Sequence, residues 1–266
     1  LFLTLTGGDP LLRSDFPEIY HHARRLGMVV SIFTNGTLIT PEIADLLAAY
    51  TPRVVDITLY GATAQTYELV TRMPGSFARV QRGIQLLRER QVPFSLKTMV
   101  LTVNQHEFNE MKAFAERLGV KFRYDGLLWP RLDGNPAPLE FQIPLEDLIA
   151  FEFRNQEIQK EWLRLSQRFE GQVTRHERVF SCGIGRRSFH IDSQGMLGGC
   201  MSVRRPAYDL KKMPFLEGWK QLGELPLLKR QLDTPCRSCT LNDLCNQCPG
   251  WSQAVHGDDE TPVAFI

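Results

Sequence analysis

All six cysteines of this chain lie in its last third: Cys182, Cys200, Cys236, Cys239, Cys245 and Cys248. The last four fall within one short stretch, CRSCTLNDLCNQC, where they form two C-x2-C pairs. Thiolates at this spacing on a tight loop can hold a soft metal centre. The sequence therefore predicts that the last third of the chain binds metal.

The spacing alone leaves the kind of metal centre open. A disulfide framework is disfavoured, because the chain is long and its 266 residues contain no export-signal pattern. Sites with four thiolate ligands serve both structural zinc and iron–sulfur clusters. We therefore expect a reducing, cytoplasmic setting and carry both metals forward.

A second set of residues suited to ligand binding follows the predicted strands of the first half. The first strand runs into TGGDP, the second into TNG and the third into LYG. Gly7 and Gly8 let a ligand approach the backbone closely, and Asp9 adds a carboxylate. Each ending alone is typical of an ordinary turn. Three such endings on successive parallel strands favour one shared pocket.

The elements that would position these residues alternate between strands and helices. Short β-rich runs predict strands at Leu1–Thr6, Val29–Thr34, Val54–Leu59, Phe94–Leu101 and Lys121–Leu128. Amphipathic stretches lie between them, and this repetition indicates a parallel sheet. Periodicity does not choose between a partial (β/α) barrel and an open doubly wound sheet.

Local patterns indicate where the helices lie and which faces they bury. Two apolar stripes predict buried faces: Phe16, Ile19, Tyr20, Ala23 and Leu26 in one helix, and Phe77, Val80, Ile84 and Leu87 in another. Thr40 before Pro41 predicts a helix start, and Gly119 predicts a helix end. Asn104 with Glu107 suits a capping arrangement.

The pattern changes after about Gly134. The segment DGNPAPLEFQIP reads as a proline-rich connector, and a helical stretch follows from Leu145 to about Arg168. Two short strands are expected around a turn at Ser193–Gly195. We predict a barrel segment at 1–135, a linker and helix at 136–179, and a cysteine-bearing domain at 180–266.

Composition narrows the classes of partner. The net charge is +1, which gives no electrostatic basis for binding nucleic acid or a membrane surface. The apolar runs are too short to cross a bilayer.

The two ends of the sequence resemble the interior of a fold. The chain opens on the strand-like LFLTLT and closes on the core-like PVAFI, so we expect a fragment.

Together these motifs resemble those of the radical S-adenosylmethionine (radical SAM) enzymes. LTGGDP, TNG and ITLYG follow one another as in the barrel of that family. The tail resembles the SPASM extension, an auxiliary-cluster domain, because Cys182-x12-Gly195-x4-Cys200 precedes the C-x2-C-x5-C run. The resemblance implies a partial TIM-like barrel followed by a small cluster-binding domain.

The resemblance also implies ligands and roles. S-adenosylmethionine (SAM) would bind with its methionyl group at Gly7, Gly8 and Asp9, with Thr58 at the ribose and Asn35 in the same pocket. Cys182, Cys200 and Cys248 would hold one auxiliary [4Fe-4S] cluster, and Cys236, Cys239 and Cys245 a second. It assigns no catalytic side chain.

Three departures from the family pattern stand out. Asp9 replaces the usual glutamate, and Cys245 and Cys248 are separated by two residues rather than three. The C-x3-C-x2-C motif of the catalytic cluster does not occur in these 266 residues. We expect it upstream of Leu1, and a last auxiliary cysteine just beyond Ile266, so the fragment itself is expected to be inactive.

The implied function is generation of a 5′-deoxyadenosyl radical for modification of a peptide or protein. An electron donor such as ferredoxin or flavodoxin is implied as a partner. Two alternatives remain: a non-enzymatic zinc-ribbon binding protein, and a non-radical barrel enzyme with structural zinc, for which Lys97 is the one tempting lysine. Charged residues on or after the later strands could face substrate, although salt bridges explain them as well: Lys97, Arg123, Asp125, Arg131 and Asp133.

Overall fold

The computed structural model describes residues 1–131, 133–154, 156–169, 177–241, 244–245 and 247–263. The chain divides into two compact units. Unit 1 comprises Leu1–Leu128 with Phe141–Ile143, and unit 2 comprises Trp129–Glu140 with Pro144–Ile266. Among the described residues, no helix is both long and apolar enough to cross a membrane. The domain boundaries expected at 135 and 180 stay predictions.

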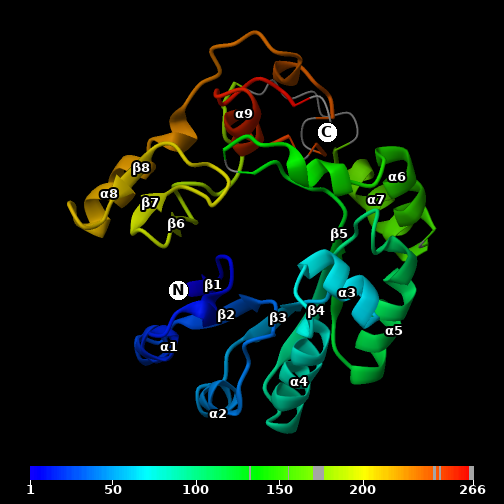
Figure 1. Cartoon of the computed structure of the whole chain (residues 1–266). Helices are drawn as coiled ribbons and strands as arrows, with labels where there is room; N and C mark the ends of the chain where they lie inside the picture. Colours follow the sequence, from blue (N-terminus) through cyan, green and yellow to red (C-terminus); the bar gives the residue numbers. More distant parts are fainter. Residues whose placement is uncertain (132, 155, 170–176, 242–243, 246, 264–266) are drawn as a thin grey trace. The chain divides into compact units, whose positions relative to one another are not determined.

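Unit 1 is built on a parallel five-stranded sheet (Figure 1). Its strands are β1 (Phe2–Leu5), β2 (Val29–Thr34), β3 (Val54–Thr58), β4 (Phe94–Met99) and β5 (Phe122–Asp125). All five predicted strands are confirmed, although β4 and β5 end two or more residues earlier than expected. The spatial order β1-β2-β3-β4-β5 follows the chain. Doubly wound sheets reverse their order at a switch point and barrels do not, so this sheet is a partial barrel.

Five helices and two 3-10 turns connect the strands. They are η1 (Pro10–Leu12), α1 (Phe16–Arg25), α2 (Pro41–Ala49), α3 (Ala64–Thr71), α4 (Ser76–Glu89), η2 (Gln105–Glu107) and α5 (Phe108–Leu118). The core lies between helices and sheet, where Val30, Ile32, Val55, Ile57 and Leu96 are buried. Successive strand residues point to opposite faces, so the alternate residues of β2 to β5 face away from this core.

Of the two apolar stripes predicted to be buried, one is confirmed and the other only in part. In α4, Val80, Ile84 and Leu87 are buried and Phe77 packs against the core, which confirms that stripe. In α1, only Phe16, Tyr20 and Ala23 are buried, while Ile19 and Leu26 are 37% and 60% exposed. The prediction was wrong for these two residues because Ile19 lies on the flank of the helix, beyond the narrow face that meets the sheet, and Leu26 follows the last helical residue, Arg25.

Helix ends follow the local signals in two of three cases. Thr40 accepts a hydrogen bond from the backbone N–H of Ile43 at 3.3 Å and Pro41 opens α2, as predicted. Gly119 ends α5 in the left-handed conformation, with φ of 68°.

The capping arrangement predicted for Asn104 and Glu107 is wrong. Asn104 makes no side-chain cap bond and instead accepts from the N–H of Leu101 at 2.8 Å. Glu107 accepts from the N–H groups of Ala62 and Thr63, at 2.6 and 3.1 Å, and so caps α3 rather than its own helix. Both side chains meet the loop after β3, and these tertiary partners replace the local ones.

Unit 2 contains a small antiparallel sheet and four helices among its described residues. The elements are η3 (Ala137–Phe141, whose last residue belongs to unit 1), α6 (Leu145–Phe153), α7 (Gln156–Phe169), β6 (His190–Ile191), β7 (Met196–Gly198), β8 (Ala207–Asp209), α8 (Phe215–Leu222), η4 (Leu225–Leu227), η5 (Pro235–Arg237) and α9 (Pro249–Val255). The two strands predicted around Ser193–Gly195 are confirmed as β6 and β7. The helical stretch predicted from Leu145 is two helices, because α6 ends at Phe153.

Candidate functional site

A cavity of about 450 Å³ opens where the first four strands of unit 1 end. Carboxyl ends of parallel strands meet at one edge of a sheet, which is why residues far apart in sequence share this cavity. Its lining is Thr6, Gly7, Gly8, Phe33, Thr34, Asn35, Thr58, Tyr60, Val70, Thr71 and Lys97. Four of the five residues that the sequence assigned to a SAM site therefore meet here; Asp9 is the exception.

The two glycines form an open part of the cavity wall. Gly7 has φ of 136°, a conformation that other residues rarely adopt. A Cβ atom added at Gly7 or Gly8 would meet nothing within 4 Å. The space beside their backbone is therefore free for a ligand, which can approach the peptide groups closely.

Asp9 lies behind the wall rather than in it. Its side chain is buried, at 6% exposure. One oxygen accepts from the N–H of Leu11 at 3.0 Å, and the other accepts from the hydroxyl of Thr34 and the N–H of Asn35 at 2.7 and 2.8 Å. Asp9 thus ties the loop after β1 to the end of β2, and both oxygens already have protein donors.

Asn35 and Thr58 complete the polar lining. The side-chain carbonyl of Asn35 accepts from the N–H and hydroxyl of Thr37, at 2.9 and 2.6 Å, which fixes the amide at the cavity edge. Burial raises the pKa of the Tyr60 phenol, the charge of Asp9 raises it further, and a hydrogen bond with Thr58 opposes both. Tyr60 was not singled out from the sequence, although its position two residues after Thr58 places it on the same face.

Charged residues continue along the face of the sheet that points away from the helical core. The Lys97 ammonium lies 3.6 Å from the centre of the Phe33 ring. Burial lowers the pKa of Lys97, the carboxylate of Asp56 opposes this effect, and the charge of Arg123 adds to it. The two aspartates considered for substrate contact bond locally: Asp125 accepts from the N–H of Leu127 at 3.0 Å. Asp133, which belongs to unit 2, accepts a hydrogen bond from the N–H of Asn135.

In unit 2, two other cysteines act on the thiol of Cys248. Burial raises the pKa of the Cys248 thiol, a hydrogen bond from the N–H of Gly250 lowers it, and the neighbouring Cys200 and Cys182 raise it further. Charge effects of this kind act at short range, so Cys200 and Cys182 each lie in the neighbourhood of Cys248. They are the three that the sequence grouped into one cluster.

The remaining cysteines, Cys236, Cys239 and Cys245, lie on or after η5 and are partly to fully exposed. None of the six forms a disulfide. Within the described ranges, no three His, Cys, Asp or Glu side chains are arranged to hold a single metal ion. A cluster needs its thiolates further apart than one ion does, because several irons and sulfides lie between them.

The comparison with protein families decides what kind of barrel this is. A family model described as "Radical SAM superfamily" matches residues 2–115, which span β1 to α5. Residues 2–115 match the radical SAM superfamily, which confirms the resemblance seen in the sequence. The alternatives of a zinc-ribbon binding protein and of a non-radical barrel enzyme are thereby set aside.

Two curated radical SAM relatives match nearly the whole chain. The AdoMet-dependent heme synthase of Methanosarcina barkeri (strain Fusaro / DSM 804) is 28% identical over 289 residues, covering 99% of this chain and 82% of that protein. The mycofactocin maturase MftC of Mycobacterium ulcerans (strain Agy99) is 28% identical over 258 residues, covering 92% of this chain and 68% of that protein. Among solved structures, Streptococcus suis SuiB bound to precursor peptide SuiA gives a TM-score of 0.66 at 15% identity, over 92% of this chain and 60% of that one. This last likeness confirms the fold.

Radical SAM enzymes use SAM and [4Fe-4S] clusters, and the two units differ in what they fit. The cavity of unit 1 suits SAM, because open glycine backbone and polar strand ends line it. Residues 1–181 contain no cysteine, so unit 1 has no thiolate for a cluster. All cluster-type ligands of this chain are the six cysteines of unit 2.

Proposed function

We propose that this radical SAM chain binds SAM in the cavity of unit 1 and acts on a peptide substrate. The observation that carries the proposal is the meeting of Gly7, Gly8, Asn35 and Thr58 in one cavity at the ends of β1 to β3. When bound, SAM and a reduced cluster supply a carbon-centred radical that abstracts a hydrogen atom from the substrate.

The chain's own residues bind and orient the cofactor. The backbone carbonyls at Gly7 and Gly8 would accept hydrogen bonds from the methionyl ammonium, because both residues are exposed and line the cavity. The hydroxyl of Thr58 and the amide of Asn35 would contact the ribose. Asp9 would act indirectly, since its bonds to Thr34 and Asn35 hold two walls of the cavity together.

Unit 2 would hold the auxiliary clusters. Cys182, Cys200 and Cys248 would ligate one cluster, a grouping that the effect of Cys200 and Cys182 on the pKa of Cys248 supports. Cys236, Cys239 and Cys245 would ligate a second. We further propose a cytoplasmic enzyme that receives electrons from a ferredoxin or flavodoxin.

The relatives favour two substrate classes. The maturase MftC and the structure of SuiB with its precursor peptide support a peptide substrate. The heme synthase, which matches 99% of this chain, supports a tetrapyrrole as a second candidate.

The test begins with the anaerobically purified and reconstituted full-length enzyme. We expect brown protein with iron and sulfide, and SAM binding by equilibrium dialysis. Under a strong reductant it should release 5′-deoxyadenosine, whereas the 266 residues alone should bind iron without release. Faster release with a precursor peptide than with an iron tetrapyrrole would support the peptide class, and the reverse order would favour the tetrapyrrole. Colourless, zinc-containing protein that does not bind SAM would refute the proposed function.

A further inference from the structure

The face of the sheet that points away from the helices carries charged side chains on β3 to β5. Parallel strands covered by helices are usually apolar on both faces. Here Asp56, Lys97 and Arg123 share the face with Ser95, because Lys97 is the register partner of Arg123 and Asp56 is that of Ser95. Of the two carboxylates on this face, Asp125 lies further along β5, and Asp56 lies beside the two cations.

That carboxylate is already fully engaged. Asp56 is 2% exposed; one of its oxygens accepts from the hydroxyl of Ser95 at 2.6 Å, and the other accepts from the guanidinium of Arg123. No ion pair within the described part of the chain includes Lys97, and its ammonium lies over the Phe33 ring. The carboxylate of Asp125, further along β5, is turned to the backbone of Leu127.

The surroundings of Lys97 leave room for an anion. The eleven residues that line the cavity include Lys97 and no Asp or Glu. Arg123 is paired but its side chain is 59% exposed, so it keeps donors for a second partner. A half-buried ammonium without a carboxylate partner is destabilised by partial desolvation, and an incoming carboxylate would relieve this.

We propose that Lys97, with Arg123 beside it, binds a carboxylate group of the substrate. The inference rests on the proposed function, because a substrate must lie next to bound SAM for hydrogen abstraction. Arg123 on β5 is the strand neighbour of Lys97 on the side away from β1, and it does not line the cavity. The pair therefore extends from the cavity away from Gly7 and Gly8, which points to the substrate rather than to the cofactor's own carboxylate.

The test uses the full-length enzyme with propionate as the carboxylate probe and propionamide as its uncharged isostere. Binding is followed by NMR of lysine- and arginine-labelled protein, with and without saturating SAM. We expect saturable shifts of the Lys97 and Arg123 side-chain signals with propionate only. Lys97→Met should weaken propionate binding at least about tenfold, the loss expected for one charge-assisted hydrogen bond. Lys97→Arg should retain it.

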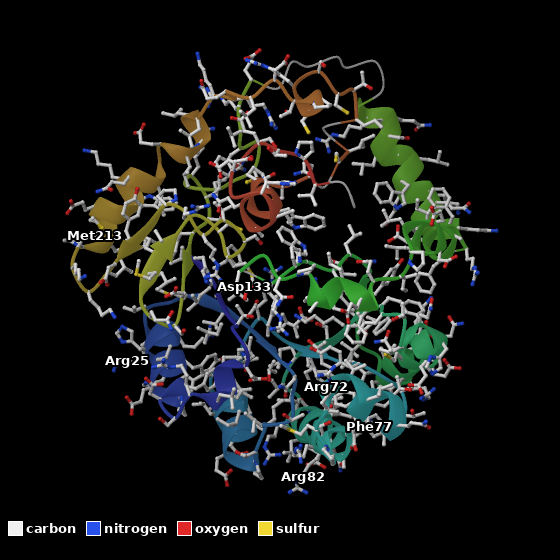
Figure 2. The ribbon with its side chains drawn as sticks, turned by 45° about the horizontal axis from the view of Figure 1, so that its top comes forward. Arg25, Arg72, Phe77, Arg82, Asp133 and Met213 are labelled. Atoms are coloured by element: carbon white, nitrogen blue, oxygen red, sulfur yellow. The ribbon has the colours of Figure 1, made fainter. Side chains whose placement is uncertain are left out.

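Arg82→Met is the matched control, because Arg82 is exposed on α4 and its side chain points away from the sheet (Figure 2). Absence of saturable binding, or equal binding by wild type and Lys97→Met of unchanged melting temperature, would overturn the inference. The inference would also be overturned if SAM displaced propionate and Lys97→Met bound SAM tenfold more weakly. In that case Lys97 would bind the carboxylate of the cofactor and not that of the substrate. Failure of the proposed function would give a different result, because the wild-type enzyme would then not bind SAM. The propionate titration without SAM would still show whether Lys97 binds a carboxylate.

Discussion

The buried carboxylate of Asp9 accepts a 2.7 Å hydrogen bond from the hydroxyl of Thr34, which joins the ends of two neighbouring strands. The same oxygen accepts from the N–H of Asn35. Two loops that are 25 residues apart in sequence are thereby held as walls of one cavity.

Replacement of Asp9 by Ala should loosen these walls. Three donors would lose their acceptor, so the free energy of unfolding should fall by about 1–3 kcal/mol. SAM affinity should fall as well, because Gly8 and Asn35 would no longer be held in place. Urea unfolding and equilibrium dialysis measure the two effects, with the exposed Asp45→Ala as control. If Asp9→Ala bound SAM as tightly as wild type, Asp9 would not be needed to position the cavity walls.

Gly8→Val should abolish SAM binding while leaving the fold intact. The added side chain points into open space in the protein, so it costs little stability, but it occupies the space where the ligand would approach the backbone. Thermal melting should match that of wild type, and dialysis should detect no bound SAM. If the variant folded well and bound SAM normally, the assignment of the loop at Gly7 and Gly8 to the SAM site would be wrong.

Glu107→Gln should lower stability in a pH-dependent manner. Burial alone would raise the pKa of Glu107, but hydrogen bonds from Thr63, Thr66 and the backbone of Ala62 outweigh it and lower the pKa. A lowered folded-state pKa means that the stabilisation is fully present above the ordinary glutamate pKa and is lost as pH falls through the folded value. Wild type should therefore exceed Glu107→Gln by about 1–3 kcal/mol above about pH 5, and the difference should shrink below about pH 4.

The measurement for Glu107 is urea unfolding across that pH range. Glu110→Gln, at an exposed position of α5 three residues further along the chain, is the matched control and should show no such difference. A gap between Glu107→Gln and wild type that widens on acidification would contradict the direction of the pKa shift.

Joint replacement of Cys236 and Cys239 by Ala should remove one cluster. Iron content should fall by about four atoms per chain. The melting temperature of unit 2 should drop, because ligation energy is also folding energy. Iron analysis and calorimetry test this, with Ser238→Ala between the two cysteines as control. Unchanged iron and melting would show that this pair does not ligate.

Features that depend on a few consecutive residues could be predicted from the sequence. The five strands, the start of α2 at Pro41 and the end of α5 at Gly119 follow from local patterns that the backbone obeys. The glycines after β1 and the cysteine spacings are equally local. They were enough to predict a SAM site and a metal-binding tail, because the order of motifs along the chain is itself a signal.

Only the tertiary structure decided what the long-range side chains do. Asp9 meets Thr34 and Glu107 meets Thr63 because the carboxyl ends of parallel strands converge on one edge of the sheet. Asp56 and Arg123, 67 residues apart, pair across β4 because the strand register places both on the same face of the sheet. Such contacts depend on strand register and order, which no local pattern encodes. Lys97 is therefore an ordinary strand lysine in the sequence, and only in the folded sheet is it a cation without a carboxylate partner among the described residues.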